Sequence, residues 1–110
     1  MATPEQFFEI DMRVGTVVQA HAFPEARKPS IKLVIDFGSE LGMRHSSAQL
    51  TMHYTPGQLV GRQVIAAVNV GTRRIAGFSS EVLVLGAMPT PAEVVLLSVE
   101  KHVANGTRIG

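Results

Sequence analysis

The sequence of 110 residues contains no cysteine and no tryptophan, and only 5% of its residues are aromatic. Without cysteine the chain forms no disulfide, no thiolate metal site and no thiol nucleophile. With so few aromatic rings, the core is expected to be aliphatic, built from Val, Ile, Leu and Met. The length predicts one domain spanning residues 1–110, with a core at about 7–109.

Targeting features are also missing. The first thirteen residues, MATPEQFFEIDMR, lack the basic region and apolar run of a secretory signal. No apolar run approaches the roughly 20 residues of a transmembrane helix. These absences predict a soluble, cytoplasmic protein.

Carboxylates are absent from the middle of the chain. No Asp or Glu lies between Glu40 and Glu81. The same window contains four arginines: Arg44, Arg62, Arg73 and Arg74. The overall net charge of +1 hides this local excess of positive charge. This distribution favours a surface that binds an anionic partner. The alternative is that a segment of a β-barrel contains no acidic residue by chance.

Apolar and polar residues alternate along most of the chain, which predicts β-strands. The clearest case is IKLVIDFG, where residues 31, 33, 35 and 37 are apolar. The other expected strands are residues 10–19, 43–51, 62–70, 81–87 and 93–100. Between the third and fourth strands, TPGQLVG predicts one helical turn, with Thr55 as N-cap, Pro56 at the first helical position and Gly61 after its end.

This order of elements predicts an all-β fold with one short helix. Five short strands with a helical turn between the third and fourth are the plan of the OB-fold, a five-stranded Greek-key antiparallel barrel. The remaining apolar segments are expected to form extra C-terminal strands. The GSELG segment at residues 38–42 is expected to be a turn.

Arg73 and Arg74 lie on a connection between apolar segments. An arginine side chain presents a planar set of donors that suits phosphate, and it stacks on nucleic-acid bases. Because neighbours on an extended segment point to opposite sides, one arginine is expected to reach a ligand and the other to pair with a carboxylate such as Glu81. Phe78 offers apolar surface for a peptide. The alternative is a solvated loop whose arginine stems cover apolar surface.

The polar segment RHSSAQ is a second candidate binding region. A strand so polar in an apolar chain faces solvent or a ligand, or it is an edge strand that discourages aggregation. Asn69 is either a buried amide or a ligand contact. The expected nucleic-acid or peptide-binding residues are therefore Arg44, Ser46, Ser47, Gln49, Asn69, Arg73, Arg74, Phe78 and Ser80. Should the nucleic-acid face lie elsewhere, Arg13, Arg27 and Lys28 are the next candidates.

Catalytic motifs are lacking. His45 precedes Ser46 and Ser47, but neighbours on one strand point apart, so this arrangement supplies no general base to a nucleophile. There is no nucleophile elbow and no phosphate-binding glycine loop. His45 and His53 match no common metal-ligand spacing. The sequence predicts no catalytic residue, no cofactor and no metal, and a small hydrolase is the least favoured alternative.

Two long stretches resemble the tRNA-binding domain, an OB-fold module appended to some aminoacyl-tRNA synthetases and related cytokine-like proteins. They are FEIDMRVGTVVQAHAFPEARKPSIKLVIDFG and VNVGTRRIAGFSSEVLVLGA. Within the family, PEARKPSIKLVIDFG, SSAQLT, RRIAGFSSEVLVLG and NGTRI resemble the free-standing protein-export chaperones. The resemblance implies a non-catalytic homodimer that binds tRNA-like nucleic acid and unfolded or precursor polypeptides. Synthetase-appended members are lysine-rich, whereas this chain has only Lys28, Lys32 and Lys101, which favours peptide binding over tight tRNA binding.

Phe7 and Phe8 precede the first strand. A small barrel has a narrow interior, so these rings need a cover outside it. They are expected at a two-fold interface between protomers, or alternatively as a plug in the open barrel end. The competing function is a structural homodimer that binds no nucleic acid.

Overall fold

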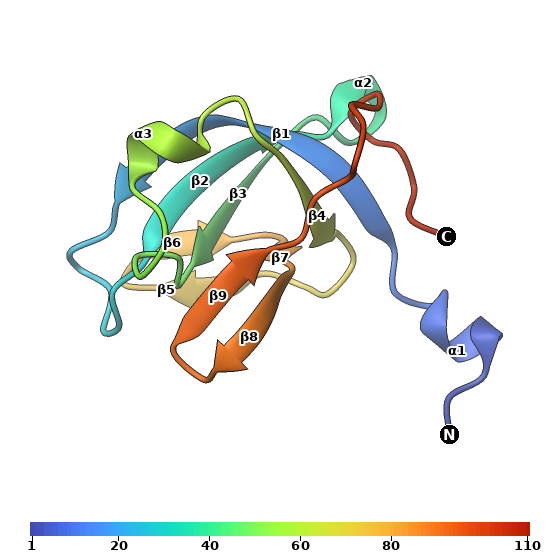
Figure 1. Cartoon of the computed structure of the whole chain (residues 1–110), viewed down its shortest axis with the longest axis horizontal. Coiled ribbons are helices and arrows are strands. Elements are labelled where there is room, and N and C mark those ends of the chain that lie inside the picture. Colours follow the sequence, from blue (N-terminus) through green and yellow to red (C-terminus); the bar gives the residue numbers. More distant parts are fainter.

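Five antiparallel strands form the main sheet of the computed structural model, which describes residues 1–110 (Figure 1). The order across the sheet is β3-β2-β1-β4-β7. The strands are β1 (Met12–Ala22), β2 (Ile31–Asp36), β3 (Met43–Ala48), β4 (Gln63–Ala67) and β7 (Leu83–Val84). Because β4 returns to lie beside β1, the first four strands form a Greek key. The OB-fold expected from the sequence is confirmed.

The barrel is nearly closed where β3 meets the residues before β7. The Glu81 amide donates to the carbonyl of His45 at 2.8 Å. The Ser46 hydroxyl donates to the carbonyl of Val82, also at 2.8 Å. Side chains therefore supply part of the hydrogen bonding that a regular strand pair would make here.

The core lies inside this barrel. The alternation of β2 buries Ile31, Leu33 and Ile35, as its sequence predicts. The core is aliphatic apart from two rings, Phe23 and Phe37. Gly15 of β1 faces this core, and a Cβ there would lie 2.6 Å from Ile35 Cγ2, so any side chain at this position would collide with the sheet.

Three short helices are present, where the sequence predicts one. The expected helix is α3 (Pro56–Leu59), which follows a capping box at Thr55 and ends before Gly61, whose φ is +92°. The other two are α1 (Pro4–Phe7) and α2 (Gly38–Leu41). Each has only four residues, too few for a helical period to show in the sequence. None of the three helices has the length and apolarity to cross a membrane.

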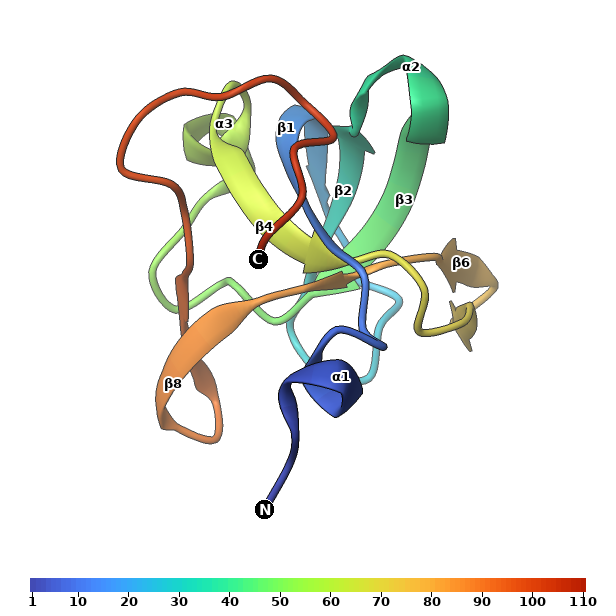
Figure 2. The ribbon, with the colours of Figure 1, turned by 90° about the vertical axis from the view of Figure 1, so that its right-hand side faces the viewer.

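Two β-hairpins extend the barrel. The predicted strand at 81–87 is divided, because β7 pairs with β4 whereas β8 (Gly86–Thr90) turns back to pair with β9 (Glu93–Leu96). A second hairpin, absent from the sequence prediction, joins β5 (Arg73–Ile75) to β6 (Phe78–Ser80). Figure 2 shows the two hairpins projecting to opposite sides of the barrel.

The two ends of the chain lie differently relative to the barrel. The C-terminal segment runs along β1, where the Gly106 amide donates to Val14 and the Ile109 amide donates to Met12. At the other terminus, α1 stands clear of the barrel (Figures 1 and 2). One end of the chain is thus packed on the barrel and the other is exposed.

Candidate functional site

The β5–β6 hairpin, residues 73–80, holds the two adjacent arginines and is called here the arginine hairpin. Its turn residues, Ala76 and Gly77, have φ angles of +47° and +83°, as a two-residue turn between twisted strands requires. Arg73 pairs with Ser80 and Arg74 with Ser79. The two arginines therefore lie on opposite faces of the hairpin, as expected for neighbours on an extended segment.

No carboxylate neutralises this hairpin. Arg74 donates only to the hydroxyl of Ser79, at 3.1 Å, and Arg73 makes no side-chain hydrogen bond. The expectation that Glu81 pairs with one of the arginines is wrong. Glu81 Oε1 instead accepts from the His45 amide at 2.8 Å, because this amide lies at the outer edge of β3 and has no strand partner.

Phe78 joins the arginine hairpin to the barrel. Its ring makes edge contacts with Phe23 and His45, with centroid distances of 5.5 and 5.8 Å. The Lys32 ammonium lies 4.6 Å from the Phe23 ring and 5.3 Å from the Phe78 ring. Phe78 is consequently half-buried, and its ring has a cation, Lys32, close to it.

The polar strand β3 divides into a structural part and a surface part. Ser46 is fully buried, and its hydroxyl is used in barrel closure. Arg44 is half-buried and donates to the carbonyl of Leu41 at 3.0 Å. The Ser47 amide donates to the hydroxyl of Ser80, which is buried as well. Ser47 and Gln49 remain at the surface beside the arginine hairpin.

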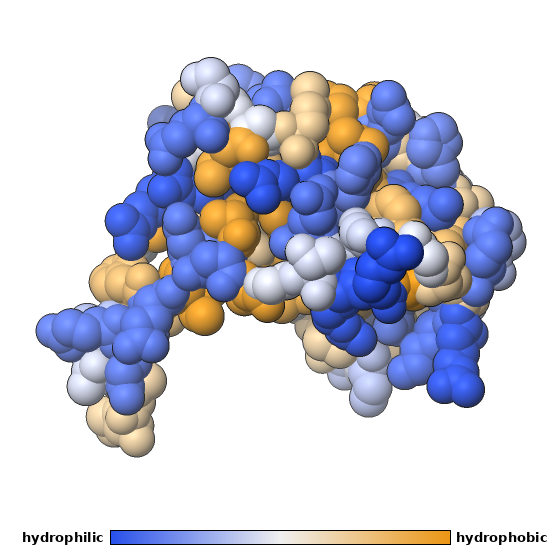
Figure 3. Space-filling model, turned by 180° about the vertical axis from the view of Figure 1, so that it is seen from behind, coloured by the Kyte–Doolittle hydropathy of each residue, from blue (hydrophilic) through white to orange (hydrophobic).

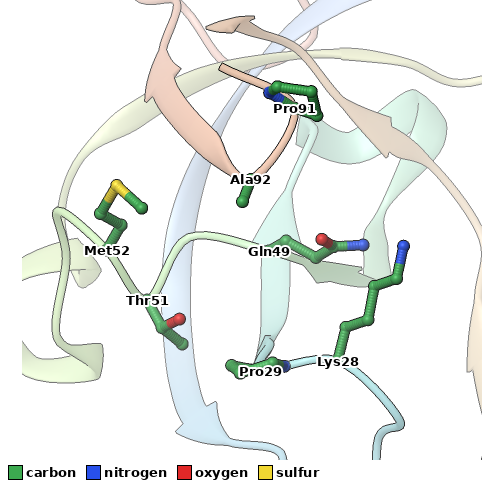
Figure 4. A pocket seen from close by; sticks show the side chains of 7 residues that line it. All are labelled: Lys28, Pro29, Gln49, Thr51, Met52, Pro91 and Ala92. Atoms are coloured by element: carbon green, nitrogen blue, oxygen red, sulfur yellow. The ribbon is translucent and has the colours of Figure 1, made fainter. Parts of the chain in front are cut away.

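These surface residues line a groove of about 410 Å³, called here the hairpin groove. It lies between β3, the arginine hairpin and the β8–β9 hairpin. Its polar lining includes Lys28, Ser47, Gln49 and Arg73, and its apolar lining includes Leu83, Met88 and Val94. A neighbouring pocket of about 450 Å³ shares Lys28, Gln49 and Pro91 with it (Figure 4). The structure thus brings together three predicted site residues, Ser47, Gln49 and Arg73, while sequence reasoning missed the apolar part of the groove.

Asn69 does not line the groove. Its carboxamide oxygen accepts from the Asp11 amide, and its amide nitrogen donates to the carbonyl of Glu9, both at 2.8 Å. Asn69 therefore holds the N-terminal segment against the end of β4. Neither interpretation of Asn69 from the sequence predicts these two hydrogen bonds, because the partner residues lie about sixty residues away in the chain.

Phe7 and Phe8 lie at the surface. They are 51% and 43% exposed, and their rings meet edge to face with centroids 5.2 Å apart. Figure 3 shows the N-terminal segment standing away from the body of the molecule, with apolar side chains gathered on the adjacent face. This placement contradicts the alternative that the two rings plug the barrel end.

Titratable side chains form isolated pairs. No three His, Asp or Glu side chains gather closely enough to hold a metal ion. His53 contacts Glu93 at 2.6 Å, and Arg13 contacts Asp11 at 2.7 Å. The hydrogen bond that Arg13 donates to the Asp11 carboxylate raises the pKa of Arg13 above its ordinary value.

Comparison with known proteins gives the family. Residues 12–108 match the family model described as "Putative tRNA binding domain". The chain belongs to the tRNA-binding domain family. It is 35% identical to the methionine–tRNA ligase of Methanocaldococcus jannaschii over 92% of its length, and 33% identical to that of Methanococcoides burtonii over 99%. It spans only about 15% of the length of these ligases.

Solved structures of chaperones match the whole chain. The CsaA chaperone of Bacillus anthracis is 53% identical with a TM-score of 0.95, covering 100% of this chain and 99% of that one. The CsaA chaperone of Picrophilus torridus is 42% identical with a TM-score of 0.91, covering 100% of both chains. The resemblance of the sequence to free-standing chaperones of this family is thereby confirmed.

Proposed function

We propose that the protein is a non-catalytic, homodimeric binding module that binds tRNA-like RNA and unfolded or precursor polypeptides. The observation that carries the proposal is the arginine hairpin, whose guanidinium groups have no carboxylate partner and which borders an apolar groove. The similarity to CsaA chaperones over the full chain, together with the tRNA-binding family match, supports both kinds of ligand.

The RNA-binding part rests on positive charge. Arg73 and Arg74 on β5 and Lys32 on β2 are three cations without an ion pair, and Lys32 contacts the hairpin through the ring of Phe78. Each of these cations suits one phosphate. So few contacts give binding that is weak at physiological salt and tolerant of sequence. A tRNA ligand also favours the cytoplasm as the place where the protein acts.

The polypeptide-binding part rests on the hairpin groove. A volume of about 410 Å³ lies within the range of ligand pockets, roughly 300 to 1,000 Å³. Leu83 and Met88 in its lining are 53% and 60% exposed. Exposed apolar groups of this kind bind the side chains that unfolded proteins present, and precursors for export are such proteins.

The homodimer rests on the N-terminal segment. Phe7 and Phe8 expose two aromatic rings on a segment that Asn69 fixes to the barrel. A symmetric dimer would cover these rings against the partner.

One titration tests the proposal. Total tRNA and a denatured precursor protein are each titrated into the full chain, and each is then used to compete with the other. We expect both to bind and each to displace the other. If the dimer forms but binds neither ligand, the proposal is wrong and the protein is a structural homodimer, the alternative that the exposed rings favour.

A further inference from the structure

We infer that the hairpin groove selects extended peptide segments in which apolar residues alternate with carboxylates. This inference deepens the proposed polypeptide binding and rests on it. A groove that binds unfolded chains by apolar contact alone would accept segments of either charge. The positive charges around this groove would instead favour acidic segments over basic ones.

The first argument is charge complementarity. Lys28 and Arg73 both line the groove, and no Asp or Glu is among its lining residues. Neither cation makes an ion pair within the protein. A carboxylate in the groove would therefore gain charge-assisted hydrogen bonds without displacing an internal partner, whereas a lysine would meet two like charges.

The second argument is the apolar lining between these cations. Leu83, Met88 and Val94 belong to β7, β8 and β9, so the apolar surface continues across three strands. Methionine is flexible and adapts to side chains of different shape. A segment with apolar residues on one face would place them here and direct its remaining side chains toward the rim.

The third argument is the unused hydrogen-bonding capacity of Gln49. Neither its backbone nor its side-chain amide makes a hydrogen bond within the protein. It follows directly after β3 and lines both pockets. In Figure 4 its amide end and the Lys28 side chain extend to the same side of the pocket. An extended peptide supplies the donors and acceptors that match such a strand edge, and its carboxylates would lie near Lys28.

The same geometry explains why RNA and such a peptide would exclude each other. Arg73 lies in the arginine hairpin and also lines the groove. A phosphate and a peptide carboxylate would compete for its guanidinium group. Competition should therefore be strongest for acidic peptides.

The test uses three fluorescein-labelled peptides of about nine residues, each spanning roughly 30 Å when extended. Leucine alternates with Glu in the first, with Gln in the second and with Lys in the third. At low salt we expect the Glu peptide to bind the full chain about tenfold more tightly than the Lys peptide, with the Gln peptide between them, and high salt to reduce the difference.

Two variants with equal charge changes locate the effect. Arg73→Glu should reverse the preference toward the Lys peptide. Arg108→Glu, on the exposed C-terminal segment outside the groove, should leave it unchanged. Equal binding of all three peptides, or an unchanged preference in Arg73→Glu, would overturn the inference.

Other outcomes separate the inference from the proposed function. If a denatured precursor binds but the peptides show no charge preference, the inference fails and the function stands. If neither tRNA nor a denatured precursor binds, the proposed function itself fails. If Arg73→Glu changes the sedimentation coefficient, the groove is an interface between two copies of the chain, which also overturns the inference.

Discussion

Two regions of this molecule use arginine and aromatic residues in opposite ways. At the N-terminal corner, defined by Phe7, Phe8, Asp11, Arg13 and Asn69, the polar groups are bonded internally and the rings are exposed. Arg13 donates to Asp11 at 2.7 Å and to the carbonyl of Gly106 at 3.1 Å. In the arginine hairpin the ring of Phe78 is packed and the guanidinium groups face solvent.

The difference shows that the partner of a side chain decides its role more than its residue type does. Arg13 stabilises the attachment of the C-terminal segment to β1, so little of its charge is available to a ligand. Arg73 has no such partner. The exposed rings of one region suit assembly, and the unpaired cations of the other suit an anionic ligand.

The largest expected effect concerns the rings of the N-terminal corner. In a Phe7→Ala, Phe8→Ala variant we expect the dissociation constant of the proposed dimer to rise about a hundredfold, because the proposed interface would lose two aromatic anchors. Sedimentation equilibrium measures this constant, and circular dichroism verifies the fold. A folded variant that stays fully dimeric would show that Phe7 and Phe8 do not contribute to a dimer interface.

Two neighbouring serines on β3 test which residues of this strand stabilise the barrel and which bind the peptide. Ser46→Ala should lower the free energy of unfolding by about 1 to 2 kcal/mol, because the buried carbonyl of Val82 loses its donor. Ser47→Ala should leave stability within about 0.5 kcal/mol and weaken peptide binding. Urea unfolding and peptide titration of one batch give both quantities. Equal stability losses in the two variants would contradict this division of β3.

The sequence was sufficient for the parts of the fold that repeat a simple pattern. The alternation of β2 and the capping residues of α3 predict those elements correctly. The arginine hairpin was missed because its turn has Ala76 at a position with φ of +47°, where Gly or Asn would be expected. The groove was missed because its lining comes from residues 28 to 94, and only the closed barrel brings them together.

A smaller effect is expected at Asn69. Asn69→Ala removes two hydrogen bonds to the N-terminal segment, so the free energy of unfolding should fall by about 1 kcal/mol. tRNA affinity per folded molecule should be unchanged, since Asn69 lies outside the arginine hairpin and its carboxamide is already bonded within the protein. Filter binding at a temperature well below the midpoint of unfolding measures the tRNA affinity. A loss of affinity without a loss of stability would make Asn69 a ligand contact.

The central claim is that the unpaired cations of the arginine hairpin, together with Lys32 over the Phe78 ring, bind RNA phosphates. The salt dependence of tRNA affinity tests this claim most directly. Three phosphate contacts, from Arg73, Arg74 and Lys32, predict a slope of log affinity against log salt of about −2 for the native protein. Arg73→Gln with Arg74→Gln should reduce the slope to about −0.7 and weaken binding to all RNAs alike. The charge-matched control, Lys101→Gln with Arg108→Gln, should keep the native slope. An unchanged slope in the hairpin variant would contradict the account and move the RNA-binding face toward Arg27 and Lys28.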